Sequence, residues 1–163
     1  MGLDMYLEVR EYVRTSDWAK QGEEYVKVPV QAGANILEAA GLTKYASKDG
    51  YGATVSTTAI YWRKVNSIHQ WFVDNCGDGR DECQEMYVSP DKLVQLKDIV
   101  DTVLKSKNVA VAQEMLPTQA GFFFGSQDYD EYYWGDLEYT QKELERIFAE
   151  GIEDVSFYYQ ASW

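Results

Sequence analysis

The chain contains one histidine, His69, and histidine is the side chain best suited to acid–base chemistry near neutral pH. It lies between Val65 and Phe72 in an apolar pattern of helical spacing, so a core histidine with one hydrogen-bond partner is the favoured interpretation. The alternative is a histidine at the floor of a pocket beside that helix. No serine or cysteine lies in a nucleophile-elbow context such as G-x-S-x-G. The sequence therefore predicts no catalytic residue, and a non-enzymatic protein is favoured over an enzyme.

His69, Cys76 and Cys83 follow one another at intervals of seven residues and raise the question of a metal site. Zinc sites favour C-x₂₋₄-C pairs and need a fourth ligand, so two small apolar thiols are the favoured interpretation. The stretch DNCGDGRDECQE (74–85) imitates a calcium loop, with acids at loop positions one, five and twelve and a glycine at six. Its third position is a soft cysteine, which favours a solvated acidic turn. We expect neither a bound metal nor a cofactor.

Two further segments could form a binding site. YWRK (61–64) leads into the helical pattern around His69, and paired cations at a helix N-terminus oppose the helix macrodipole. An ion pair with the acids at 128–131 would compensate this conflict and is the favoured explanation. The other explanation is an anion site, in which the cations meet phosphate and neighbouring rings stack on a base.

The second segment is GFFFGSQDYDEYYW (121–134), in which seven of fourteen residues are aromatic and three are acidic. Phenylalanines that alternate into the core, and carboxylates in the first turn of a following helix, would explain much of it. They leave Tyr129, Tyr132, Tyr133 and Trp134 without a role. Because tyrosine and tryptophan are favoured in interfaces and ligand pockets, such a surface is slightly favoured over pure core.

If the two segments share a cleft, they predict a site for a small anionic, nucleotide-like ligand. The predicted ligand-binding residues are Trp62, Arg63, Lys64, Asn66, His69, Phe122, Phe123, Phe124, Tyr129, Tyr132 and Trp134. The alternative function is that of an inhibitor that docks an acidic surface on a basic, nucleic-acid-binding surface of a host protein. That acidic surface would include Asp128, Asp130, Glu131 and Asp136. Surplus exposed rings would also suit a homo-oligomer.

Bulk composition limits the function classes. A chain of 163 residues predicts a single domain, residues 1–163. A net charge of −12 disfavours direct binding to nucleic acid and suits a basic partner or a small ligand held by local cations. No apolar run approaches the ~20 residues of a membrane span, and the N-terminus lacks a signal-peptide pattern, so we expect a cytoplasmic protein without a membrane partner.

Periodicity predicts the elements that would position these segments. Strands are expected at 3–13, at 24–30 with Pro29 marking an edge or an end, at 53–61 and at 155–163. Helices are expected at 35–40, at 62–75, from Ser89-Pro90 to about 107, and from Asp128 or Asp136 to Glu150. Residues 43–53 are expected to form a loop, and 108–120 to be irregular because of Pro117. The fold class that follows is α+β, a small, mainly antiparallel sheet packed against about three helices.

Four stretches together carry a resemblance: GLDMYL (2–7), YWRKVNSIHQWFVDN (61–75), YVSPDKL (87–93) and LPTQAGFFFGSQDYDEYYWGDLE (116–138). They resemble a widespread family of small acidic proteins encoded by phages and prophages, most of which are named only as hypothetical proteins. The resemblance implies a viral origin and action in the cytoplasm of a bacterial host, and it assigns no activity to any residue. Small phage proteins of this kind often act by binding, and some counter host defence. Residues 14–52 lie outside the resemblance.

Overall fold

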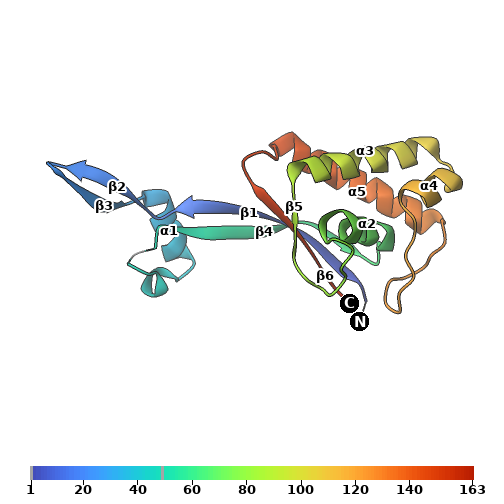
Figure 1. Ribbon diagram of the computed structural model, residues 1–163, viewed down its shortest axis with the longest axis horizontal. Coiled ribbons are helices and arrows are strands. Elements are labelled where there is room, and N and C mark those ends of the chain that lie inside the picture. Colours follow the sequence, from blue (N-terminus) through green and yellow to red (C-terminus); the bar gives the residue numbers. More distant parts are fainter. Residues whose placement is uncertain (1, 49) are drawn as a thin grey trace. The chain divides into compact units, whose positions relative to one another are not determined.

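The computed structural model describes residues 2–48 and 50–163, which fall into two compact units (Figure 1). Unit 1 comprises the chain up to Val9 together with Thr57–Trp163, and unit 2 comprises Arg10–Ser56. The boundary falls within two long strands, β1 (Asp4–Arg14) and β4 (Gly52–Arg63). The single domain expected from the chain length stays a prediction.

A four-stranded antiparallel sheet in the order β4-β1-β6-β5 runs through unit 1. Its other strands are β5 (Met86–Val88) and β6 (Ser156–Ser162), which pair with Val88 opposite Phe157. The predicted period of two is present at the start of β1, where Met5 and Leu7 are fully buried, as is Leu3 directly before the strand. The α+β class with a mainly antiparallel sheet is thereby confirmed.

The helices of unit 1 cover this sheet and pack on one another. They are α2 (Asn66–Cys76), α3 (Pro90–Ser106), α4 (Val109–Met115) and α5 (Glu131–Glu150). The start predicted for α3 is correct, since the Ser89 hydroxyl accepts a hydrogen bond from the Lys92 backbone N–H and proline follows it. The core joins these helices to the sheet. At its centre Phe72 of α2 stacks on Tyr159 of β6, with ring centroids 4.0 Å apart.

One prediction about this unit is wrong in a way that affects the site. The helix expected to begin at Trp62 begins at Asn66, because residues 60–63 continue β4. Ile60 and Trp62 are buried while Tyr61 and Arg63 are exposed, which is the alternation of a strand. Lys64 then adopts a left-handed conformation, with φ 62°, and turns the chain into α2.

Other element predictions also need correction. Residues 108–120 are not irregular throughout, since the Asn108 side chain caps α4 and Pro117 lies beyond its end. The last helix begins between the two positions offered for it, because Asp130 is its N-cap. The described residues hold five α-helices rather than about three. Strands β2 and β5 were not expected.

Unit 2 contains a two-stranded antiparallel sheet of β2 (Ser16–Gln21) and β3 (Glu24–Pro29), followed by helix α1 (Gln31–Ala39) and a 3₁₀ turn at Thr43–Tyr45. Pro29 ends β3, as predicted. Helix α1 begins about a turn before the predicted residue 35. It lies close to the end of β1, because a Cβ placed on Gly33 would be 2.2 Å from the Arg14 carbonyl oxygen.

The outer edge of β4 in unit 1 is occupied by side chains of α5. The Arg146 guanidinium donates to the Ala59 carbonyl at 2.7 Å. The Tyr139 hydroxyl donates to the Tyr61 carbonyl at 3.1 Å. Two backbone acceptors of the edge strand therefore already have partners.

Candidate functional site

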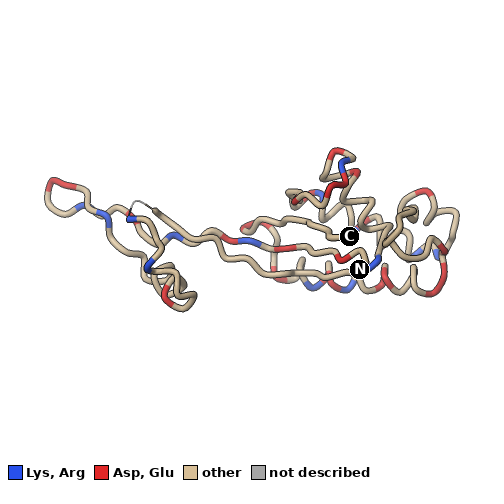
Figure 2. Tube along the Cα trace, turned by 90° about the horizontal axis from the view of Figure 1, so that it is seen from below, with Lys and Arg blue, Asp and Glu red and all other residues tan. Residues whose placement is uncertain are grey.

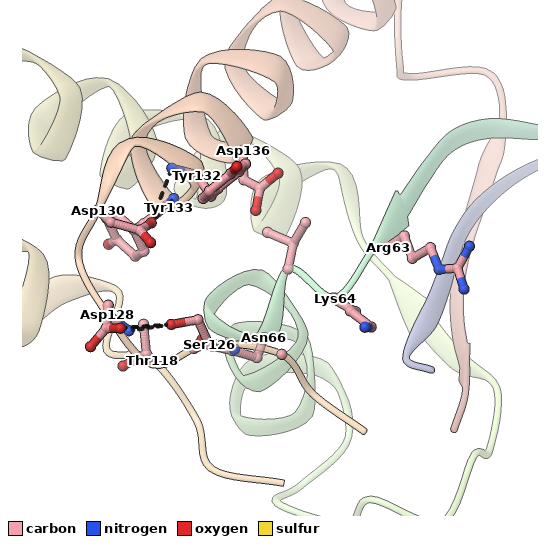
Figure 3. A pocket seen from close by; sticks show the side chains of 12 residues that line it. Arg63, Lys64, Asn66, Thr118, Ser126, Asp128, Asp130, Tyr132, Tyr133 and Asp136 are labelled. Atoms are coloured by element: carbon pink, nitrogen blue, oxygen red, sulfur yellow. Dashed lines mark hydrogen bonds between the residues drawn. The ribbon is translucent and has the colours of Figure 1, made fainter. Parts of the chain in front are cut away.

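A pocket of about 330 Å³ in unit 1 joins the two segments that the sequence singled out (Figure 3). The turn between β4 and α2 contributes one wall, and residues 125–136 contribute the other. Its lining residues are Arg63, Lys64, Val65, Asn66, Thr118, Gly125, Ser126, Asp128, Asp130, Tyr132, Tyr133 and Asp136. We refer to this cavity as the acidic pocket. It brings the turn at 63–66 together with Tyr132 and Tyr133, whereas Phe122, Phe123 and Phe124 line a different pocket.

Gly125 allows the two walls to approach each other. Its φ of 90° lies in the left-handed region that favours glycine. A Cβ at this position would lie 3.2 Å from the Lys64 Cβ and 3.4 Å from the Lys64 carbonyl oxygen. A larger residue at position 125 would therefore push the loop that precedes α5, residues 116–130 (the aromatic loop), away from the turn at Lys64.

Asn66 holds the loop from the other side. Its side-chain amide donates to the carbonyl oxygens of Phe124 at 3.0 Å and Ser126 at 2.8 Å. Its Oδ1 accepts from the Gln119 backbone N–H at 3.0 Å. Because Asn66 is buried and all three contacts are to backbone, its observed role is to position two stretches of the loop.

The carboxylates of the pocket have different surroundings. The Asp130 side chain accepts from the backbone N–H groups of Tyr132 and Tyr133, so it caps α5. Asp128 accepts a hydrogen bond from the Ser126 hydroxyl at 3.1 Å. Burial, and secondarily the charge of Asp130, raises the pKa of Asp136 to about 6. The pocket thus has three carboxyl groups on one wall.

The two cations contribute less positive charge to the pocket than the sequence suggested. The Arg63 side chain points away from the carboxylates in Figure 3, and its Nε lies 3.9 Å from Asp4 Oδ1. The ion pair expected between these cations and the acids at 128–131 is thus replaced, for Arg63, by a pair with Asp4. Lys64 is exposed on the rim. Neither cation is part of α2, although Lys64 directly precedes its N-cap, Val65.

The other predicted rings are divided between core and surface. Trp62 is 1% exposed and donates its indole N–H to Thr140 Oγ1 at 2.9 Å, so its ring is part of the core. Phe124 is also buried, whereas Phe123, Tyr129 and Trp134 are half-buried. Phe122 is 95% exposed, and Tyr132 is 74% exposed at the edge of the acidic pocket. Only part of the predicted set can therefore contact a ligand as the structure stands.

His69 is fully buried, as expected, but it has two partners rather than one. Its Nδ1 lies 2.8 Å from the Tyr159 hydroxyl, and its Nε2 lies 3.1 Å from Asp81 Oδ2. Burial, and secondarily Asp81, raises the pKa of Tyr159 well above its ordinary value, so the phenol keeps its proton. The histidine tautomer sets which atom donates in each of the two hydrogen bonds. Both ring nitrogens of His69 therefore have hydrogen-bond partners, and the bond to Tyr159 joins α2 to β6.

Metal ligands do not gather in the part of the chain that the structure describes. No group of three or more His, Cys, Asp or Glu side chains is close enough to hold an ion among residues 2–48 and 50–163. Both cysteines are free, and burial raises the pKa of Cys76 to about 11. This thiol is therefore a poor nucleophile and a poor ligand near neutral pH.

No helix of these residues combines the length and apolar character needed to cross a bilayer. Comparison with protein-family models, with curated proteins and with solved structures finds no match.

Proposed function

We propose that this protein acts by binding, and that its acidic pocket receives a basic group from a protein partner. The observation that carries the proposal is the charge of the pocket, in which Asp128, Asp130 and Asp136 face the cavity while the Arg63 side chain points away to Asp4. A lysine or arginine side chain would neutralise the carboxylate wall. With the viral origin that the sequence resemblance implies, the partner is a host protein in the bacterial cytoplasm.

Tyr132 supports a cationic occupant. Its ring is exposed at the edge of the pocket, and its helix begins at the Asp130 cap. A cation within about 6 Å of a tyrosine ring is attracted to the ring face, and a neighbouring carboxylate adds to that attraction. Tyr132 and Asp136 together thus offer an arginine both a flat surface and a charge partner.

The experiment titrates a labelled peptide of alternating arginine and glycine against the wild-type protein and against the double variant Asp128→Asn/Asp136→Asn. We expect the double variant to bind about tenfold more weakly, which corresponds to about 1.4 kcal/mol. We also expect wild-type binding to weaken from 50 to 300 mM salt, because exposed charges are screened. Asp130 is left unchanged because it caps α5.

The matched control is Glu114→Gln/Glu153→Gln, which removes two exposed charges outside the pocket. If this control weakens the peptide as much as the double variant does, binding follows overall charge and the pocket has no special role. Binding that ignores salt would also contradict the proposal. Capture from bacterial lysate with the wild type and the double variant, compared side by side, then identifies the partner.

A small nucleotide-like anion is a second candidate, favoured by the presence of Arg63 and Lys64 in one cavity with Tyr132. It would require Arg63 to turn from Asp4 toward the pocket. Nucleotides and cyclic dinucleotides should then raise the Tm of the wild type, and Arg63→Ala should abolish the shift. If no nucleotide moves the Tm of the wild type, this candidate fails while the basic-partner proposal is unaffected.

A further inference from the structure

A second cavity of unit 1, of about 310 Å³, lies beside residues 119–124 of the aromatic loop. It shares no lining residue with the acidic pocket. Its walls combine aromatic rings with a carboxylate, and we refer to it as the phenylalanine pocket. The rings are those of Phe122, Phe123, Phe124 and Trp163, and the carboxylate is that of Asp81.

The turn that presents these phenylalanines is fixed by backbone contacts. The Phe124 backbone N–H donates to the Gly121 carbonyl at 3.2 Å and closes the turn. The Leu3 backbone N–H donates to the Phe123 carbonyl, also at 3.2 Å, and joins the turn to the chain directly before β1. A Cβ on Gly121 would lie 2.5 Å from the Phe124 ring, so glycine is needed here. The rings therefore belong to a pocket that is already formed.

Several ring faces of this pocket are open to solvent. Phe122 is 95% exposed and Trp163 is 45% exposed, whereas Phe123 is half-buried. The Phe122 and Phe123 rings are inclined by 88°, with centroids 4.8 Å apart, and the Phe124 and Trp163 rings by 69°, with centroids 5.9 Å apart. Because the rings of each pair are steeply inclined, the pocket presents both faces and edges to an occupant.

Asp81 adds a carboxylate with a fixed orientation. Its Oδ1 accepts a hydrogen bond from the Trp163 indole N–H at 3.2 Å, and its Oδ2 lies 3.1 Å from His69 Nε2. A carboxylate has about four lone-pair sites, so these two contacts leave it able to accept further hydrogen bonds. The Asp81 side chain is 27% exposed, which leaves it within reach of a ligand.

The charge around the pocket favours a cation. No lysine or arginine lines the cavity within the described part of the chain. The chain outside residues 10–56 holds nine Lys or Arg and 21 Asp or Glu, so unit 1 carries the whole net charge of −12; Figure 2 marks these positions along the trace. Such a field raises the local concentration of cations and repels anions.

We propose that the phenylalanine pocket binds a guanidinium group. A guanidinium is flat, so it stacks on the open rings, and its N–H groups lie in its plane, so they reach the Asp81 carboxylate at the same time. A primary ammonium donates hydrogen bonds but has no flat face, and a quaternary ammonium has no donor. The charge of this ligand is opposite to that of the nucleotide-like ligand expected from the same phenylalanines.

The guanidinium has two sources, an arginine within a protein chain or a free guanidino compound. The test follows the tryptophan indole N–H signals in proton–nitrogen NMR spectra of the full chain, and Trp163→Phe identifies the signal of Trp163. Two probes are titrated: Nα-acetyl-arginine methylamide, which represents an arginine within a chain, and free arginine. We expect the Trp163 signal to shift until the pocket is saturated. No tryptophan lines the acidic pocket, so this readout is specific to the phenylalanine pocket.

The matched ligand control is Nα-acetyl-citrulline methylamide, in which a neutral urea replaces the guanidinium at nearly the same size. It should bind about tenfold more weakly, because it lacks the charge that strengthens hydrogen bonds to a carboxylate. This comparison needs no change in the protein, so it does not depend on whether a variant folds.

The protein variant is Phe122→Ala, which should weaken the arginine probe about threefold through the loss of one cation–π contact. Phe122 is almost fully exposed, so its removal should leave the Tm unchanged. Tyr132→Ala is the control, since it removes an exposed ring from the acidic pocket and leaves the total charge unaltered. It should leave the Trp163 shift as it is in the wild type.

Binding of the acetylated probe supports an arginine within a protein chain, whereas binding of free arginine alone supports a free guanidino compound. The proposal is overturned if neither probe moves the Trp163 signal, or if the citrulline compound binds as well as the arginine compound. Equal weakening by Phe122→Ala and Tyr132→Ala would overturn it as well. Failure of the acidic pocket in its own peptide test would leave these expectations unchanged, because the two cavities have different lining residues.

Discussion

Asp136 is the carboxyl group of the acidic pocket whose pKa is raised. It is half-buried on α5, and burial and the nearby Asp130 raise its pKa to about 6. Its ordinary pKa is 3.8, so the folded protein holds its proton more tightly than the unfolded chain does. The contribution of the Asp136 carboxyl to the free energy of unfolding is therefore fully present below pH 3.8, and it is lost as the pH rises through about 6.

We predict that Asp136→Asn raises the free energy of unfolding at pH 7.5 by about 1 kcal/mol, after allowance for solvent screening. The gain should shrink toward zero at pH 4, where the wild-type carboxyl is itself largely protonated. Urea unfolding at the two pH values measures the difference. Glu138→Gln, an exposed position two residues further along α5, is the control. An equal gain for both variants would show that general charge repulsion is the cause.

Single residues were predicted from the sequence with mixed success. The burial of His69 was recognised because its neighbours at helical spacing are apolar. Its second partner, Asp81, was not recognised, since a contact across twelve residues between a helix and a loop leaves no periodic pattern. Trp62 was assigned to a ligand surface because tryptophan is frequent in binding sites. The alternation of Ile60, Trp62 and the polar residues between them would have indicated a core strand.

At the scale of elements, one buried side chain positions much of the pocket. Asn66 is the first residue of α2, and it holds the carbonyls of Phe124 and Ser126 and the N–H of Gln119. These bonds replace the regular backbone pairing that the loop lacks. The conformation of the loop therefore depends on the side-chain amide of Asn66, which donates and accepts hydrogen bonds at the same time.

We predict that Asn66→Asp destabilises the protein by about 2–3 kcal/mol, because a carboxylate cannot donate to the two carbonyl oxygens. Residues 117–128 should become sensitive to limited proteolysis, while the helical circular dichroism persists. Asn75→Asp is the matched control at the far end of the same helix, since Asn75 donates to only one carbonyl, that of Trp71, and its Oδ1 accepts from Lys92 Nζ, which a carboxylate can also do. Equal sensitivity of the two variants would contradict the role given to Asn66.

Long elements followed from the sequence, whereas short ones did not. Strands β1 and β6 and helices α3 and α5 each run for seven or more residues and repeat their pattern several times. Strand β5 has three residues, and helix α4 has two turns with one buried residue, Ala112. Such elements are fixed by packing and by the Asn108 cap rather than by periodicity. The shared cleft of residues 61–64 and 121–134 was a condition of the predicted ligand site rather than a prediction. The orientation of Arg63 toward Asp4 was not predicted, because it depends on a tertiary ion pair.

At the scale of the whole molecule, the net negative charge belongs to unit 1, whereas the cations and anions of residues 10–56 are equal in number. Composition gives only an average, a net charge of −12 over 163 residues. The division at residues 10 and 56 shows that the average hides a neutral unit. Residues 14–52, which lay outside the sequence resemblance, fall entirely within this unit.

The two units should respond separately to mutation. We predict that Gly33→Ala disturbs unit 2 alone, since its methyl group would meet the Arg14 carbonyl oxygen and the Thr15 Cα, both within 3 Å. Amide exchange at residues 12–40 should accelerate, while the core amides of β6 and α3 stay protected.

The control for this prediction is Gly135→Ala on α5. A Cβ there meets no atom within 4 Å, so the substitution should stabilise the helix by about 1 kcal/mol. If Gly33→Ala lowers protection in β6 as much as in α1, the units unfold together and the division has no thermodynamic meaning.

The contacts that Arg146 and Tyr139 make with β4 affect the tendency of this protein to form fibres in concentrated solution. A chain so rich in rings and strands risks templated growth, in which one sheet recruits another along an open border. At the edge strand β4, an added strand would need to donate hydrogen bonds to backbone carbonyls. The Ala59 carbonyl already accepts from Arg146, and the Tyr61 carbonyl already accepts from Tyr139. Ordered fibres seeded from that border are therefore disfavoured for as long as α5 remains in place.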